Sequence, residues 1–384
     1  MPFEQLARSP NRTLEPSTDL DDADSASGSA RKSRRRFQHP LLAVALAFAV
    51  LVLVELAVQA RAQWRYGQSI FNQVSQTSRY QFDPLTDLML LRPSTRFEGR
   101  QQLMVSNQYG LRGPAPPLER PTGGLRLAVL GASTAMGAYA STDATTVSAL
   151  LQQQLAAALP GRQVEVINAG VVGFTLAEQT RLLDRLLWRF DPDAIIVMPG
   201  TNDMAGYCRK VQPRRTLPQP LWAPTANAWS LSYELLRKNT VLLTDALSAP
   251  SHRQNPLRVD PTPFVVGLQR LMDTAAARQI PLVLATHARA FRREQPLAEQ
   301  RRLSESARYY SPCFDLEGLH VLFDRHNGLL IEAATARSLG VVRLDKQVPG
   351  GDRWFADAGH FTDQGNQVAA EAIADHLLSS DLLH

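Results

Sequence analysis

Short apolar runs alternate with longer amphipathic stretches from residue 125 onward. The apolar runs, rich in Val, Ile and Leu, predict parallel strands that are buried on both faces. These strands are expected at residues 125–130, 163–168, 194–198, 281–286 and 340–344. The amphipathic stretches predict helices at residues 145–159, 176–190, 263–278, 320–338 and 363–378, the last with Thr362 as its N-cap. The alternation predicts a three-layer α/β/α sandwich around a five-stranded parallel sheet.

A different pattern occupies the N-terminal part of the chain, where residues 41–60 are almost uninterruptedly apolar. This stretch is long enough for a transmembrane helix, and Glu55 lies near its outer end, where a carboxylate can reach the interface. Trp64 and Tyr66 follow, as expected of an interfacial aromatic belt. The basic cluster Arg31–Arg36 precedes the stretch and predicts a cytoplasmic N-terminus. We therefore expect a single-pass protein of the bacterial inner membrane with its larger part in the periplasm.

Two other interpretations of the apolar stretch remain. Val58 and Ala60 are small residues at a plausible cleavage site, which would make it a cleaved signal peptide. A buried helix of a soluble protein would also be apolar. Residues 1–40 lack apolar periodicity and include an acidic cluster, so they predict a disordered cytoplasmic tail.

Between the anchor and the first predicted strand, residues 61–124 form a connecting segment with extended pieces at 83–113. Residues 125–384 form the main domain, interrupted by insertions at about 204–262 and 287–318. Cys208 and Cys313 fall in the two insertions, where they would form either a disulfide or two separate thiols. No ligand cluster surrounds them, so neither a metal site nor a cofactor is expected.

The charge of the chain excludes few classes of function. The net charge of +5 arises partly from the basic cluster beside the anchor. The chain has no basic region with interleaved aromatic residues, so nucleic-acid binding is not predicted. Both insertions are locally basic, which is typical of a solvated surface and also of a cleft that attracts an anionic substrate. The basic residues of the two insertions are Arg209, Lys210, Arg214, Arg215, Arg289, Arg292, Arg293, Arg301 and Arg302.

Three strands end in residues that can do hydrolytic chemistry. Ser133 follows a glycine after the first strand, Gly173 follows the second, and Asn202 follows the third. The carboxyl ends of parallel strands share one edge of a sheet, where such folds bind ligands. Near the C-terminus, Asp357 and His360 supply an acid and a base three residues apart. A serine hydroxyl needs such a base to become a nucleophile.

These blocks, taken in order, resemble those of the SGNH (GDSL-like) hydrolase superfamily. The resemblance covers roughly residues 125–380 and implies a flavodoxin-like fold. It also implies a triad of Ser133, His360 and Asp357, and an oxyanion hole made by the backbone N–H groups of Ser133 and Gly173 with the side-chain amide of Asn202. One residue departs from the family pattern, because the Asp that names the GDSL motif is Ala132 here. That departure leaves open what supports the turn at Ser133.

Three further residues or segments have expected roles. Asp203 is expected to support its loop by hydrogen bonds, and His287 follows a strand but has no acid at short spacing. Residues 107–113 resemble a stretch upstream of the first block in exported relatives and also fit a structural turn.

The predicted function is that of a membrane-anchored, exported serine esterase. Its expected substrate is an acylated carbohydrate or a small ester, with acetyl groups on a cell-envelope or exported glycan favoured. One alternative is a polysaccharide O-acyltransferase that uses the same residues. Another is a non-catalytic envelope protein that binds glycan or assembles with envelope polysaccharide machinery, for which a broken triad would be typical.

Overall fold

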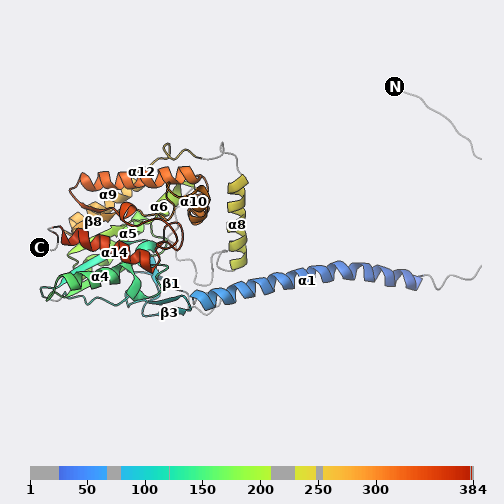
Figure 1. The fold of residues 1–384 in the computed structure, drawn as a ribbon. Helices are drawn as coiled ribbons and strands as arrows, with labels where there is room; N and C mark the ends of the chain where they lie inside the picture. Colours follow the sequence, from blue (N-terminus) through green and yellow to red (C-terminus); the bar gives the residue numbers. More distant parts are fainter. Residues whose placement is uncertain are drawn as a thin grey trace, which may run out of the picture. The chain divides into compact units, whose positions relative to one another are not determined.

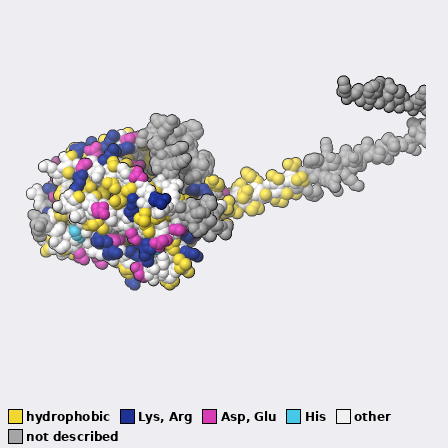
Figure 2. Space-filling view, turned by 90° about the horizontal axis from the view of Figure 1, so that it is seen from above, with side chains coloured by type: hydrophobic (Ala, Val, Ile, Leu, Met, Phe, Trp, Pro, Cys, Tyr) yellow, Lys and Arg dark blue, Asp and Glu magenta, His cyan; other side chains and the backbone are white. Residues whose placement is uncertain are grey.

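The computed structural model describes residues 26–66, 79–120, 122–208, 230–247, 254–380 and 382. The chain divides into two compact units, Met1–Val54 and Glu55–His384. Helix α1 (Ala26–Tyr66) begins in the first unit and ends in the second (Figure 1). Within it, Pro40–Arg65 is apolar and long enough to cross a membrane, with a mean hydropathy of 2.9. Apolar side chains cover the described part of this helix (Figure 2).

The start of α1 corrects one prediction. Residues 26–40 were expected in a disordered tail, but they are helical. Arg, Lys and Ala are good helix formers, so the basic cluster extends the apolar helix towards its N-terminus without apolar periodicity of its own. Residues 1–25, with the acidic cluster, lie outside the described residues.

The predicted five-stranded parallel sheet is confirmed. Its strands are β5 (Leu125–Gly131), β6 (Val164–Gly170), β7 (Ala194–Met198), β8 (Leu282–Ala285) and β9 (Gly340–Val342). They lie in the order β6-β5-β7-β8-β9, and every neighbouring pair is parallel.

Both faces of the sheet are buried, as the continuous apolar runs predicted. Leu127 and Val129 of β5 point into one core, whereas Ala128 and Leu130 point into the other. The first core is covered by α4 (Val147–Ala158) and α14 (Asp363–Leu378). The second is covered by α5 (Leu176–Arg185) and α9 (Thr262–Ala277) (Figure 1).

The helices lie near their predicted ranges, and one helix and one strand show how element ends differ from the prediction. The helix expected to reach residue 190 stops at Arg185, and the 3₁₀ turn η2 (Leu187–Phe190) follows. Strand β9 ends at Val342 because the Thr286 hydroxyl donates to the Asp345 carboxylate and accepts from the Asp345 N–H, which turns the chain away from the sheet. Thr362 caps α14 as predicted, accepting the N–H of Gly365.

The remaining elements lie in the connecting segment, in the insertions and between the strands of the main domain. Two antiparallel hairpins account for the extended pieces expected at 83–113, namely β1 (Tyr80–Asp83) with β2 (Leu88–Leu91), and β3 (Arg96–Gly99) with β4 (Gln102–Val105). The remaining helical elements are α3 (Ser133–Met136), η1 (Asp143–Thr145), α6 (Asn202–Ala205), η3 (Gly206–Cys208), α8 (Leu231–Leu247), α10 (Leu297–Leu303), α11 (Glu305–Tyr310), α12 (Leu316–Thr335) and α13 (Leu344–Gln347).

A disulfide joins the two insertions. Cys208 at the end of η3 is bonded to Cys313, which precedes α12, and their Cα atoms lie 5.3 Å apart. Of the two alternatives that the sequence left open, the structure therefore shows the bonded one.

Replacing both cysteines by serine should lower the free energy of unfolding by about 4–5 kcal/mol, because the bond closes a loop of 105 residues in the unfolded chain. Urea unfolding of the native protein and the double variant measures this difference. Reducing agent should destabilise the native protein and leave the variant unaffected. Equal midpoints for the two proteins would contradict the expectation.

Candidate active site

The residues singled out after the first three strands lie along one edge of the sheet. Gly131 at the end of β5 pairs with Gly170 of β6 and with Met198 of β7, so the three strands end at the same level. Ser133 and Asn202 come a few residues later, each in the first turn of a short helix. The sheet therefore brings these separate sequence blocks to one place.

Close packing explains the glycines at this edge. A Cβ on Gly170 would lie 2.1 Å from the amide nitrogen of Met136, and a Cβ on Gly131 would lie 2.3 Å from the Met198 carbonyl oxygen. On Gly200 it would lie 2.3 Å from the Cβ of Ala132 and 3.1 Å from Nδ2 of Asn202. The strand ends and the loops after β5 and β7 therefore touch, which larger residues would prevent.

The structure also shows what supports the turn at Ser133 in the absence of an aspartate at position 132. Ala132 is buried, and its carbonyl accepts the N–H of Met136 at 3.0 Å. The Ser133 carbonyl accepts the N–H of Ala138 at 2.9 Å. Backbone hydrogen bonds and close packing therefore hold the turn.

Ser133, His360 and Asp357 form a continuous hydrogen-bonded chain. The distance from Ser133 Oγ to His360 Nε2 is 2.7 Å, and His360 Nδ1 lies 2.8 Å from Asp357 Oδ2. The backbone N–H groups of Gly359 and His360 both donate to Asp357 Oδ1 at 3.0 Å. The sequence-predicted nucleophile, base and acid are thus brought together, although 227 positions separate Ser133 from His360.

The electrostatics of Asp357 suit an orienting role. Burial alone would raise the pKa of this carboxyl, but the hydrogen bond and charge of His360 and the two backbone amides outweigh it, so its pKa is lowered. Asp357 is therefore ionised at neutral pH and accepts from Nδ1 of His360. That tautomer leaves Nε2 as the acceptor for the Ser133 hydroxyl.

Gly173 and Asn202 are the other two predicted site residues. They lie on the loops that follow β6 and β7. Asn202 Nδ2 donates to the Phe174 carbonyl at 2.9 Å, which uses one of its two hydrogens. Gly173 has φ +80°, a left-handed conformation that favours glycine. In the described part of the chain, no backbone carbonyl accepts the Gly173 N–H. Asn202 therefore ties the loop carrying Gly173 to its own loop and keeps one N–H for another acceptor.

Asp203 supports the same loops, as expected. Its carboxyl oxygens accept the N–H of Leu176 at 3.2 and 3.4 Å, at the N-terminus of α5. Burial raises the pKa of Asp203 to about 7, and the Leu176 amide offsets only part of that effect.

Sequence reasoning missed the role of Arg112, whose guanidinium is buried. It donates to the Asp143 carboxylate at 2.7 Å and to the carbonyl of Gly137, just after α3. The segment 107–113 is thus the structural turn that one interpretation favoured, since Asn107 Oδ1 accepts the N–H groups of Tyr109 and Leu111. Only the resemblance of that segment to exported relatives gave a clue, and it did not single out the arginine.

Ser306 and Tyr139 were also missed. Ser306 Oγ accepts the N–H of Ala358 at 3.1 Å, in the loop between Asp357 and His360. The Tyr139 ring lies 5.2 Å from the His360 ring and is half exposed. Neither residue belongs to a local motif, so no sequence pattern could have found them.

His287 lies behind the site rather than in it. It is buried, its backbone N–H donates to Asn327 Oδ1 at 2.7 Å, and burial lowers its pKa to about 4. His326 packs 4.2 Å from the Phe264 ring, and its Nε2 lies 3.0 Å from the Tyr207 hydroxyl. Burial lowers the pKa of His326 to about 3.

The burial of His326 predicts a stability that decreases in acid. The unfolded chain takes up a proton as the pH falls below 6.5, whereas the native imidazole stays neutral to about pH 3. The free energy of unfolding should fall over this interval by ~1.4 kcal/mol per pH unit for this group. Asp203, whose pKa is raised, acts in the opposite direction between its ordinary value of 3.8 and about 7.

His326→Gln isolates this contribution, because glutamine can still bond to Tyr207 but does not titrate. We expect urea unfolding between pH 7 and pH 5 to show a weaker pH dependence in the variant. Parallel curves for the variant and the native protein would show that His326 takes up its proton at the same pH in the folded and unfolded chains, which would contradict the expectation.

Four of the five arginines singled out in the second insertion make contacts within the protein. Arg289 pairs with Asp324 at 2.8 Å, and Arg302 pairs with Asp352 at 3.0 Å. Arg292 donates to two backbone carbonyls at 2.7 Å. These contacts favour a structural role over recruitment of an anionic substrate. The basic residues between 209 and 215 lie outside the described residues.

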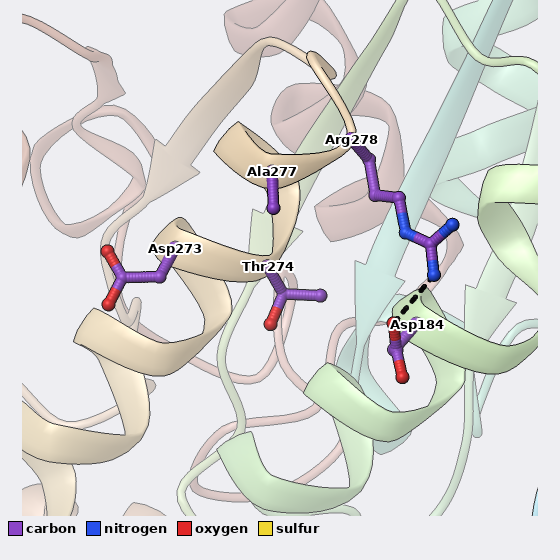
Figure 3. A pocket seen from close by; sticks show the side chains of 5 residues that line it. All are labelled: Asp184, Asp273, Thr274, Ala277 and Arg278. Carbon is purple, nitrogen blue, oxygen red and sulfur yellow. Dashed lines mark hydrogen bonds and ion pairs between the residues drawn. The ribbon is translucent and has the colours of Figure 1, made fainter.

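A pocket between α5 and α9 lies apart from these residues (Figure 3). Arg278 and Asp184 form an ion pair of 3.0 Å across it. None of the residues singled out after the strands lines it, so it is not the candidate active site.

Much of the domain that carries these residues matches one known protein family. The sequence model of the GDSL-like Lipase/Acylhydrolase family matches residues 129–368, more than half of the chain. The comparison with curated protein sequences found no match.

Similar solved structures include a lipase/acylhydrolase from Enterococcus faecalis, with 17% identity, 66% of this chain and 95% of that chain covered, and a TM-score of 0.41. A GDSL-like lipase from Bacteroides thetaiotaomicron has 12% identity, coverage of 69% and 92%, and a TM-score of 0.40. An acetyl xylan esterase has 15% identity, coverage of 65% and 98%, and a TM-score of 0.40.

Proposed function

The chain belongs to the GDSL-like lipase/acylhydrolase family of ester hydrolases, and from that premise we propose that it is a membrane-anchored, exported serine esterase acting through Ser133. The observation that carries the assignment is the hydrogen-bonded chain from Ser133 through His360 to Asp357. An intact chain of this kind speaks against the non-catalytic alternative, for which a broken triad would be typical.

The proposed reaction proceeds in two steps. His360 Nε2 takes the proton of Ser133 Oγ as the oxygen attacks the ester carbonyl, and Asp357 stabilises the imidazolium that forms. The backbone N–H groups of Ser133 and Gly173 and the remaining N–H of the Asn202 amide stabilise the oxyanion. His360 then protonates the leaving alcohol, and Ser133 holds the acyl group. Water, deprotonated by His360, releases the acid and restores Ser133.

The proposed substrate is an acyl ester, with acetyl favoured, on a cell-envelope or exported glycan. This assignment rests on the proposed placement of the domain outside the cytoplasm. The disulfide between Cys208 and Cys313 supports that placement, since disulfides persist in oxidising compartments. If a sugar hydroxyl replaced water in the second step, the same residues would make the chain an O-acyltransferase.

Incubation with p-nitrophenyl acetate, alone and with candidate glycan acceptors, tests the reaction. We expect release of nitrophenol and free acetate with the native chain, and no release above background with Ser133→Ala. Acetyl groups recovered on the glycan would assign the transferase reaction. Absence of any acyl release or transfer would contradict the proposal.

The proposed topology is a single pass through the inner membrane with the N-terminus in the cytoplasm. Its support is the apolar helix Pro40–Arg65 and the basic cluster that precedes it. Reporter fusions after residue 70 should be external and fusions at residue 30 cytoplasmic, with the chain retained in membranes. A soluble mature form beginning near Arg61 would instead identify a cleaved signal.

A further inference from the structure

Glu55 is the one charged residue within the apolar stretch 41–58. A carboxylate at such a position is costly in lipid unless it has a partner, and it commonly marks a functional contact. The sequence offered only proximity to the interface as an explanation.

Glu55 accepts the side-chain amide of Gln59 within α1 at 2.6 Å, and its other partners lie at the start of helix α8. Glu55 accepts the Ser230 hydroxyl at 2.8 Å and the N–H groups of Leu231 and Ser232 at 2.9 and 3.0 Å. These donors form the N-terminus of α8, whose dipole also favours a negative charge. Glu55 lies within the apolar stretch of α1, ten residues or roughly 15 Å along the helix before that stretch ends at Arg65. Helix α8 therefore begins beside the apolar part of α1.

One exposed side of α8 carries large apolar side chains, with the polar Asn239 and Thr240 between them. In the described part of the helix, Leu236 is 66% exposed and Leu243 is 60% exposed, and their spacing of seven places them on the same face. Tyr233, three residues before Leu236, is also exposed. Large apolar side chains so close to a membrane-spanning helix are suited to contact with lipid.

Another side of α8 is bound to the hydrolase domain. Arg237 donates to the Tyr309 hydroxyl and lies over its ring at 5.1 Å, and Lys238 pairs with Glu305 at 2.6 Å. Both partners belong to α11. The cationic side chains are thus turned towards the protein, while the leucine face stays uncovered by the described residues.

We propose that α8 lies in the interfacial layer of the bilayer beside the anchor, with Leu236 and Leu243 in contact with acyl chains. Its 17 residues span about 25 Å, which is too short to cross a membrane as a helix and suits a helix lying along its surface. The inference rests on the proposed membrane anchor.

This arrangement places the candidate active site close to the membrane. Helix α11 separates α8 from the loop of His360, because Ser306 of α11 accepts the N–H of Ala358. Packed helices lie roughly 8–10 Å apart, so the site is about two helix layers from the lipid.

Spin labels on the full chain in lipid bilayers test this placement. Cysteines introduced by Leu236→Cys and Leu243→Cys can be labelled selectively, because both native cysteines are in the disulfide. Leu118→Cys is the matched control, since Leu118 is 57% exposed and its carbonyl accepts from Arg126. Arg126 is near the start of β5, at the opposite end of the strand from Ser133. The unsubstituted chain should take up no label.

We expect labels at 236 and 243 to be reached better by oxygen than by a water-soluble nickel complex, and the label at 118 to show the reverse. Nickel accessibility at 236 and 243 equal to that at 118 would overturn the proposal. Retention of the same samples in alkaline-washed membranes tests the anchor separately. Loss from the membranes would overturn both proposals, whereas retention with water-exposed labels would overturn only that for α8.

Discussion

Ser133→Ala and His360→Ala should each lower the turnover of p-nitrophenyl acetate by up to ~10⁶, because nucleophile and base act as a unit. The 2.7 Å contact between Ser133 Oγ and His360 Nε2 is the basis for this expectation. The double variant should be little worse than either single variant, since removing one member already disables proton transfer. Initial rates measured with the full chain give the comparison.

An exposed serine far from the strand ends provides the control. Ser379, at the C-terminal end of α14, bonds only locally to the carbonyl of His376, so Ser379→Ala should keep full activity. Hydrolysis at the native rate in either Ser133→Ala or His360→Ala would sink the triad assignment.

Asn202→Ala should lower turnover by ~10²–10³ and change the Michaelis constant little. The developing oxyanion loses one preorganised donor in the transition state, while ground-state binding is largely retained. Ser133 should still react slowly with an organophosphonate, because His360 and Asp357 still activate it. Steady-state kinetics separate the two parameters.

The structure adds a second consequence to this substitution. Asn202 also donates to the Phe174 carbonyl, so the variant should lose about 1 kcal/mol of stability, visible in urea unfolding. A variant with native turnover and only a weakened Michaelis constant would mean that Asn202 binds substrate and does not stabilise the oxyanion.

The strands and the triad were predictable because their patterns are local. Strand β5 is apolar along its whole length since both of its faces are buried, and the chain-order blocks ending in Ser133 and Asn202 lie directly after such strands. Asp357 and His360 share one loop, so their spacing alone shows an acid beside a base. The sequence alone therefore places these blocks at one edge of the sheet.

Contacts between distant segments were not predictable. Arg112 supports the turn after Ser133 from the separate turn at residues 107–113, and Ser306 holds the loop of His360 from an insertion. Glu55 meets the N-terminus of α8, which lies 175 positions away. Each depends on tertiary packing that no periodicity encodes. Helix ends were similarly uncertain, as the early start of α1 at Ala26 shows.

The most direct measurement of the central claim is the position of a covalent adduct. The full chain is treated with a p-nitrophenyl alkylphosphonate, digested, and mapped by mass spectrometry. The account predicts one adduct, on Ser133, that is absent from Ser133→Ala and forms much more slowly in His360→Ala. An adduct on another residue, or undiminished ester hydrolysis once Ser133 is fully modified, would contradict it.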